Sequence, residues 1–163
     1  MLFFVEAILL CLLFHAAVAY SLHQNPLNWI SDYPPAIQKR AMELGLVPRD
    51  KKRFTPAELI RKFVASLLMM VLLSLLLVYV NGAETFWQGF LLSYGLYFVV
   101  DWYDAFVVDI LIFCHSKQVI LPGTEDMVDS YHDYWFHIRM SLVGMALGIP
   151  ICLLVGLGVL ILA

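Results

Sequence analysis

The longest apolar stretch of this chain runs from position 136 to position 162 and reads FHIRMSLVGMALGIPICLLVGLGVLIL. An α-helix needs about 20 mostly apolar residues to cross the hydrocarbon core of a bilayer. Beyond Arg139 the stretch carries no charged residue, so placing it in lipid removes no charge from water. The stretch therefore predicts a membrane-spanning helix.

The composition of the whole chain agrees with a membrane environment. Hydrophobic residues make up 62% of the 163 positions and charged residues 14%, against about 45–50% and about 25% in an ordinary soluble domain. The net charge of −3 and the lack of a basic, aromatic surface pattern argue against nucleic acid as a partner. Three cysteines without a C-x-x-C motif exclude a disulfide framework and a structural zinc knuckle.

Three further stretches are long and apolar enough to span a bilayer. We therefore predict an all-α integral membrane protein, a four-transmembrane-helix bundle that forms a single membrane domain over residues 1–163. The third helix is expected to extend beyond the membrane to position 113. The predicted spans are 2–20, 63–80, 86–106 and 136–162, and the longer connections are 21–62 and 107–135.

The basic residues predict the direction of the spans. All ten lysines and arginines fall in the two connections 21–62 and 107–135 or, for Arg139, at the start of the fourth span, and the connection 81–85 has none. The positive-inside rule then places the two basic connections in the cytoplasm and both termini on the extracytoplasmic side. The expected location is a plasma membrane of the bacterial type.

Local signals predict how the connections begin and end their helices. A short amphipathic helix is expected at about Pro35–Leu44, ended by Gly45 and lying on the membrane surface. Thr55 is the expected cap of a helix that starts near Pro56. The fourth helix is expected to start near Glu125, well before it reaches lipid.

The two cytoplasmic connections carry opposite charge. The first holds eight basic and four acidic residues, a net charge of +4, and the segment 101–139 holds seven acidic and two basic residues, a net charge of −5. Opposite charges on one small protein attract each other. We therefore expect the first connection to dock on the second.

A repeated spacing predicts a polar site near the cytoplasmic boundary. Asp101, Asp104 and Asp109 occupy relative positions 0, +3 and +8, and the same offsets recur from Asp129 onward. On two continuous α-helices each set occupies one face, and facing carboxylates and imidazoles are how helical bundles hold metals. The expected metal ligands are Asp101, Asp104, His132, Asp133 and His137.

These residues lead to an enzyme hypothesis. A divalent metal (Mg, Mn, Fe or Zn) would polarise a phosphoryl or carbonyl group of an amphiphilic or lipid-linked substrate, or activate a bound water. Asp109 or His115 would transfer protons, and Arg139 would meet a negative group of the substrate. Membrane lipid is the expected environment.

Other interpretations stay open. The acidic and histidine side chains can serve structural salt bridges or lie in solvent. A haem between His15 and a histidine of the fourth helix is less favoured, because the candidate face is acidic. The main functional alternative is a non-enzymatic subunit of a larger membrane complex, homo-oligomer or transporter, docked through Gly144 and Gly148.

Overall fold

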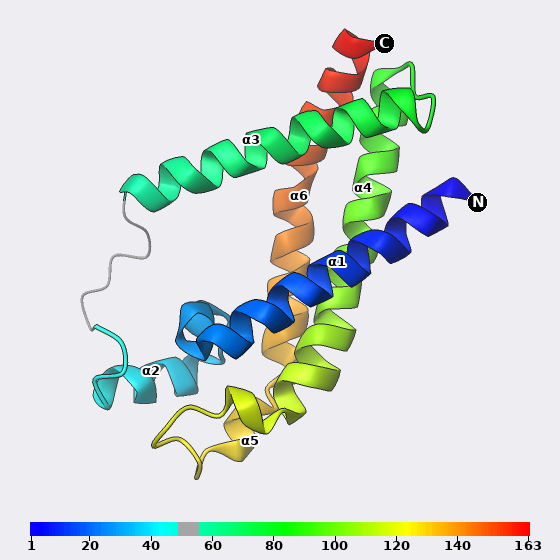
Figure 1. The fold of residues 1–163 in the computed structure, drawn as a ribbon. Coiled ribbons are helices and arrows are strands. Elements are labelled where there is room, and N and C mark those ends of the chain that lie inside the picture. The colour runs from blue at the N-terminus through cyan, green and yellow to red at the C-terminus, as the bar shows by residue number, and fades with distance from the viewer. Residues whose placement is uncertain (49–55) are drawn as a thin grey trace. The chain divides into compact units, whose positions relative to one another are not determined.

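A computed structural model describes residues 1–48 and 56–163 of the chain, and all of the regular elements in this part are helical. Figure 1 traces them in chain order. They are α1 (Leu2–Gln24), η1 (Pro26–Asp32), α2 (Pro35–Glu43), α3 (Pro56–Tyr79), α4 (Phe86–Tyr103), the π-helix η2 (Asp104–Ile112), η3 (Phe113–His115), η4 (Lys117–Val119), α5 (Val128–Tyr131) and α6 (Tyr134–Leu162).

The helices form two compact units. Unit 1 comprises Met1–Ile8, Lys52–Asp101 and Val143–Ala163, so it holds the start of α1, all of α3, most of α4 and the second part of α6. Unit 2 comprises Leu9–Lys51 and Trp102–Leu142, so it holds the rest of α1, the short elements and the start of α6.

Three helices in the described part of the chain are long and apolar enough to cross a membrane. They are Leu2–Gln24, Leu59–Tyr79 and Val128–Leu162, the last counting α5 and α6 together. Large apolar side chains stay exposed along α3, such as Phe63 at 68% and Leu68 at 58%, as expected of a helix surrounded by lipid. Helix α4 is shorter and carries Gln88 and Asp101, and a membrane span at this position stays a prediction.

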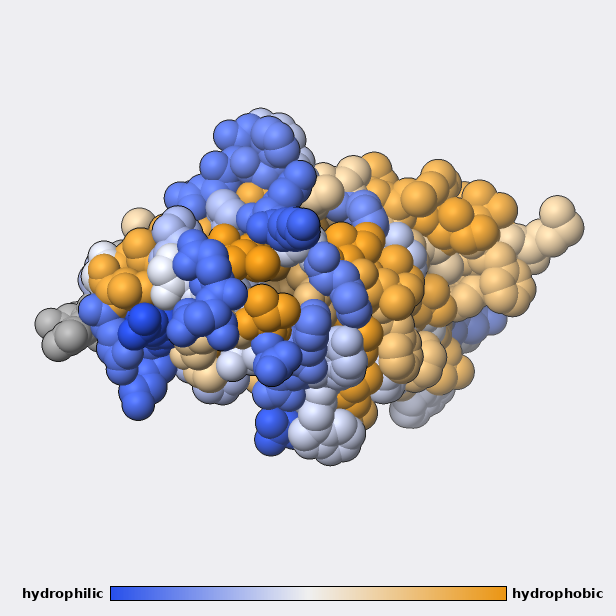
Figure 2. Space-filling view, turned by 90° about the horizontal axis from the view of Figure 1, so that it is seen from below, coloured by the Kyte–Doolittle hydropathy of each residue, from blue (hydrophilic) through white to orange (hydrophobic). Residues whose placement is uncertain are grey.

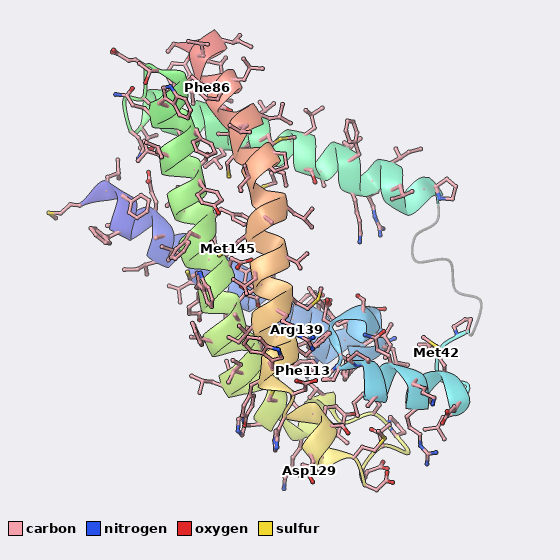
Figure 3. All side chains as sticks on the ribbon, turned by 180° about the vertical axis from the view of Figure 1, so that it is seen from behind. Met42, Phe86, Phe113, Asp129, Arg139 and Met145 are labelled. Carbon is pink, nitrogen blue, oxygen red and sulfur yellow. The ribbon has the colours of Figure 1, made fainter. Side chains whose placement is uncertain are left out.

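Within unit 1, α4 and α6 lie side by side at very short range (Figures 1 and 3). A Cβ atom added at Gly148 would overlap the ring of Tyr97, and one added at Gly89 would overlap Val159. The hydroxyl of Tyr97 donates a hydrogen bond of 2.9 Å to the carbonyl oxygen of Gly144. The small residues of α6 therefore admit an aromatic side chain of α4 almost onto the helix backbone.

Helix α3 packs against the last part of α6 in the same unit. Ser74 donates to the carbonyl of Met70 at 2.8 Å, and its side chain would collide with a Cβ atom at Gly158. Leu77, Val155 and Val159 form the apolar core beside this contact, each at most 1% exposed. Gly158 thus allows α3 to approach α6 closely, as Gly148 allows α4 to do.

The core of unit 2 forms around α2. Ile37 and Ala41 are fully buried in a cluster with Phe113, Leu121 and other apolar residues of the second connection. The hydroxyl of Tyr33 donates to the carbonyl of Val119 at 2.9 Å. The apolar face of this helix is therefore covered by protein, and its position on the membrane surface stays a prediction.

The outer side of unit 2 is more polar than the long helices. Figure 2 looks onto the side that carries α2, α5 and the connecting loops, where hydrophilic residues (blue) are numerous. The first and second connections contact each other as expected, and Arg40 donates from Nε to the carbonyl of Gly123 at 3.4 Å. The contact is built mainly on the apolar cluster around Ile37.

The fourth helix does not start at Glu125. The Glu125 carboxylate accepts the backbone N–H of Gly123 at 2.9 and 3.1 Å and so closes a turn. The hydrogen bonds from the N–H groups of Glu125 itself and of Gly123 hold the pKa of this carboxyl below its usual range. The short helix α5 then ends at Tyr131, because His132 has a ψ of 26°. Asp129 and His132 are therefore not on the helix that carries His137.

The other predicted helix boundaries agree with the structure. Helix α2 starts at Pro35, and Gly45 follows its end with a φ of +73°, which favours glycine. Helix α3 starts at Pro56. Its expected cap, Thr55, lies outside the described residues.

We predict that Gly148→Leu destabilises the protein. The added side chain has to displace the ring of Tyr97, which its hydroxyl holds against α6. Overpacking of this kind costs about 1–3 kcal/mol of the free energy of unfolding. Thermal unfolding of the purified protein in detergent measures the effect.

The matched control is Ala146→Leu, which adds similar bulk on the exposed side of the same helix. It should unfold at nearly the wild-type temperature. Equal losses in the two variants would mean that the Tyr97 contact does not limit the packing of α4 on α6.

Candidate functional site

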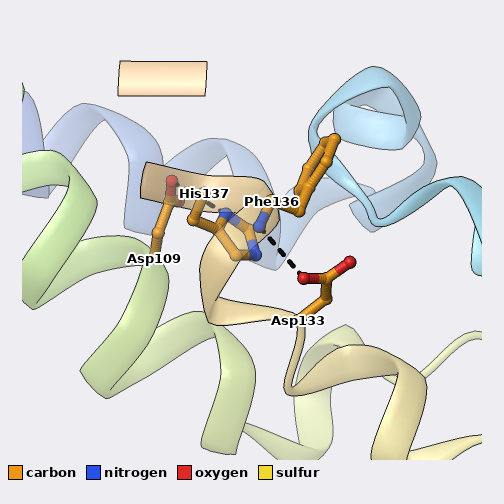
Figure 4. A network of polar contacts seen from close by, with 4 residues as sticks. All are labelled: Asp109, Asp133, Phe136 and His137. Atoms are coloured by element: carbon orange, nitrogen blue, oxygen red, sulfur yellow. Dashed lines mark hydrogen bonds and ion pairs between the residues drawn. The ribbon is translucent and has the colours of Figure 1, made fainter. Parts of the chain in front are cut away.

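The structure brings Asp109 of η2 and His137 of α6 together within unit 2 (Figure 4). Nδ1 of His137 lies 3.0 Å from Oδ2 of Asp109. An ionised carboxylate only accepts hydrogen bonds, so Nδ1 carries the hydrogen in this contact. The lone pair of a neutral His137 is then on Nε2. We call these two residues the Asp109–His137 pair.

The histidine of the pair is almost fully buried. Its side chain is 2% exposed, whereas that of Asp109 is 25% exposed. The rings of Phe113 and Phe136 pack edge-on against the imidazole at centroid distances of 5.7 and 5.2 Å. Nε2 of His137 is buried and has no hydrogen-bond partner among the described residues. Such a buried polar atom calls for an explanation, and one is a role in chemistry or ligand binding.

The π-helix η2 places the acid of the pair. Residues Asp104–Ile112 follow directly on α4, and Asp109 lies within them. Hydrogen bonds in a π-helix join residues five apart, so Asp109 follows Asp104 on nearly the same side of the element. A continuous α-helix would place these two carboxylates about 140° apart. π-Helical turns are rare and are often found at functional sites.

Asp133 caps the helix that carries the histidine. Its Oδ1 accepts the N–H of Phe136 at 3.0 Å, three residues into the sequence that follows it (Figure 4). This is the usual contact of an N-cap aspartate. One oxygen of this carboxylate, which was expected to bind a metal, therefore caps the first turn of α6. The cap helps to fix the position of His137 in that turn.

The thiol of Cys114 lies in the same neighbourhood. It is buried, and burial together with the negative charges of Asp109 and Asp133 raises its pKa to about 12. Cys114 was not among the residues expected at the site. The thiol stays protonated at neutral pH, so it is a poor nucleophile where it lies.

A second group of rings lies outside the pair, where His115 and Tyr134 are exposed and His132 is half-buried. The rings of His115 and His132 stack at 5.1 Å, and both lie about 6 Å from the ring of Tyr134. Nδ1 of His115 is 2.9 Å from the carbonyl of Ile110, and its Nε2 is 3.3 Å from the hydroxyl of Tyr134. His115 and His132 thus lie close to each other, and both rings contact the ring of Tyr134.

The remaining expected residues lie on α4, η2, α6 and α1. Asp101 belongs to unit 1, where one of its carboxylate oxygens lies against the Cα of Gly144. Asp104 is the first residue of η2, and Arg139 is exposed on α6. His15, considered as a haem ligand, is within hydrogen-bond distance of the Tyr103 hydroxyl, with Nδ1 at 3.0 Å from it.

The expected cluster of metal ligands is not assembled. In residues 1–48 and 56–163, no three histidine, cysteine, aspartate or glutamate side chains are gathered closely enough to hold a metal ion together. The broken helix explains this in part, because His132 and Asp133 lie before α6 while His137 lies within it. Of the residues expected at the site, Asp109 and His137 form a direct polar contact, and His115 and His132 stack on each other.

No protein-family model, curated protein or solved structure matches this chain. The functional argument therefore starts from the geometry of the Asp109–His137 pair.

We predict that Cys114 resists alkylation. With a pKa of about 12, about one thiol in 10,000 is ionised at pH 8, against about one in four for an ordinary cysteine. In a variant with Cys11→Ala and Cys152→Ala, maleimide labelling followed by mass spectrometry should be at least 100-fold slower than labelling of a free cysteine peptide.

Neutralising the nearby charges tests the cause. Asp133→Asn in the same background should speed the labelling, because one of the charges that disfavour the thiolate is gone. Labelling of the starting variant at the rate of a free thiol would contradict the predicted pKa.

Proposed function

We propose that this protein is an integral membrane enzyme in which His137, oriented by Asp109, acts as general acid and base on an amphiphilic substrate. The observation that carries the proposal is the buried Nε2 of His137, which has no partner among the described residues while Nδ1 is held by a carboxylate. A carboxylate on one imidazole nitrogen fixes the orientation and the tautomer of the ring, so the other nitrogen presents its lone pair for proton transfer.

The surroundings of the pair favour an amphiphilic substrate. His137 lies in the first turns of α6, a long apolar helix, and Phe113 and Phe136 pack on its ring. A substrate that presents a reactive polar group at this depth needs an apolar part that lipid accepts. Arg139, exposed two residues further along α6, is a candidate contact for a negative headgroup.

We retain the predicted topology as part of the proposal. Four spans, with α4 as the third, place η2 and the start of α6 at the cytoplasmic boundary under the positive-inside rule. Both termini are then extracytoplasmic. The long apolar helices Leu2–Gln24, Leu59–Tyr79 and Val128–Leu162 support the membrane location itself.

The second candidate is a divalent metal bound at Nε2 of His137. The favouring observation is the same carboxylate contact at Nδ1, because metal-binding histidines usually donate their other N–H to such a group. A metal here would polarise a substrate oxygen or activate water, and it would need further ligands from the substrate or from carboxylates such as Asp104. Proton transfer by His137 requires no further ligand, so we place it first.

The accessory-subunit alternative loses one of its arguments. It relied on Gly144 and Gly148 as a free docking face, and that face is covered by Tyr97 of α4 within unit 1. Another membrane chain would have to displace Tyr97 to use it. An assembly role would therefore need a different surface.

The proposal predicts that His137→Gln abolishes turnover. The protein in nanodiscs would be incubated with vesicles of a total polar lipid extract, and lipid species would be followed by mass spectrometry. Any species that the wild type converts should be converted 100- to 10,000-fold more slowly by His137→Gln, the usual loss on removing a general acid–base. The Asp109→Asn variant should also convert lipid slowly, because a neutral asparagine no longer holds the His137 ring with a negative charge.

His132→Gln is the matched control, since this histidine stacks on His115 and does not contact the Asp109–His137 pair directly. It should convert lipid at the wild-type rate. Equal turnover by wild type and His137→Gln, or no lipid converted by the wild type, would contradict the proposal.

Chelation separates the two candidates. If His137 transfers a proton without a metal, we expect dialysis against EDTA to leave the lipid conversion unchanged. Loss of activity, restored by one of Mg²⁺, Mn²⁺, Fe²⁺ or Zn²⁺, would favour the metal-dependent mechanism instead.

A further inference from the structure

A second buried polar contact lies in unit 1, between the start of α1 and the turn after α3. Nδ2 of Asn81 donates a hydrogen bond of 2.9 Å to Oε2 of Glu6. Glu6 is only 8% exposed, although glutamate is almost always at the surface unless it is paired. The contact does not involve the Asp109–His137 pair, which belongs to unit 2.

Two oxygen atoms of these side chains do not take part in this hydrogen bond. Oε1 of Glu6 and Oδ1 of Asn81 are both buried, and neither has a hydrogen-bond partner among the described residues. When Glu6 is ionised, both atoms are acceptors, so they cannot satisfy each other. A buried acceptor without a donor destabilises a fold by about 1–3 kcal/mol, and an ionised one by more.

Among the described residues of unit 1, no lysine or arginine lies near the Glu6 carboxylate. The sequence of unit 1 contains four basic residues, and all of them precede position 63. Lys62, the last of them, is separated from Asn81 by about 28 Å of helix at about 1.5 Å per residue. A buried carboxylate without a cation beside it is strongly disfavoured.

The surroundings keep the contact away from solvent. Ala7, next to Glu6, is 4% exposed, and Ala83, two residues after Asn81, is 2% exposed. Phe3 of the same turn of α1 packs against Gly95 of α4. The positive φ of Gly82, +66°, allows the chain to turn sharply after Asn81. The oxygens therefore lie in a covered corner between three helices.

We propose that Glu6 and Asn81 bind one monovalent cation of the Na⁺ class through these two oxygens. A carboxylate and an amide carbonyl are hard oxygen ligands, as such cations require. One cation neutralises the single negative charge, whereas a divalent ion would leave an excess positive charge in a buried place. A bridging water would satisfy both oxygens but would leave the charge of Glu6 uncompensated.

The test compares the thermal unfolding of the purified full-length protein in NaCl and in choline chloride at equal ionic strength. When sodium exceeds its Kd about tenfold, the wild type should unfold about 3–6 °C higher in NaCl. Glu6→Gln should unfold at the same temperature in both salts. Glu84→Gln, which alters an exposed acid close in sequence to Asn81, should respond to sodium as the wild type does.

A binding measurement covers the case in which Glu6→Gln does not fold. Radioactive ²²Na⁺ should bind the wild type and Glu84→Gln at about one ion per chain, and Asn81→Ala should need at least tenfold more sodium. Wild-type protein with no sodium-specific stabilisation and no bound ²²Na⁺ would overturn the proposal. Undiminished sodium binding by Asn81→Ala would overturn it as well.

Discussion

The contact between α4 and α6 is the constraint on which the rest of unit 1 depends. In lipid, two apolar helices gain little from hydrophobic association, so close van der Waals packing has to hold them together. Tyr97 lies against Gly148 and bonds to the carbonyl of Gly144, and Gly89 lies against Val159. Helix α3 repeats the principle with Ser74 against Gly158. Glycine thus positions both neighbours of α6.

Much of the helical architecture could be predicted from the sequence, because long apolar stretches and helix-ending residues are local signals. Pro35, Gly45 and Pro56 mark helix boundaries correctly. The start of the fourth helix was predicted incorrectly at Glu125, where two competing local structures are compatible with the same residues. An acid after a glycine can begin a helix or close a turn, and packing around Tyr131 and Leu121 accompanies the second outcome.

The site was predicted less completely than the helices. The spacing argument selected Asp109 and His137, which do meet, but it assumed two regular α-helices. The residues of η2 are apolar on nearly every side, so the sequence shows no hydrophobic periodicity that would distinguish a π-helix from an α-helix. The sequence therefore does not reveal which face of the helix each residue occupies. Asp133 acts as a cap, and Cys114 is a buried neighbour of the pair. Both roles depend on the interruption of the helix between α5 and α6, which only the folded structure defines.

The hydrogen-bond pattern of η2 has a consequence for how the Asp109–His137 pair is maintained. In a π-helix each turn accommodates about one residue more than in an α-helix, so the two patterns differ by a slip of a single position. Such a slip turns the side chains after it by about 100° relative to the side chains before it. The position of Asp109 opposite His137 therefore depends on this π-helical register, because a regular α-helix would turn Asp109 about 140° away from Asp104.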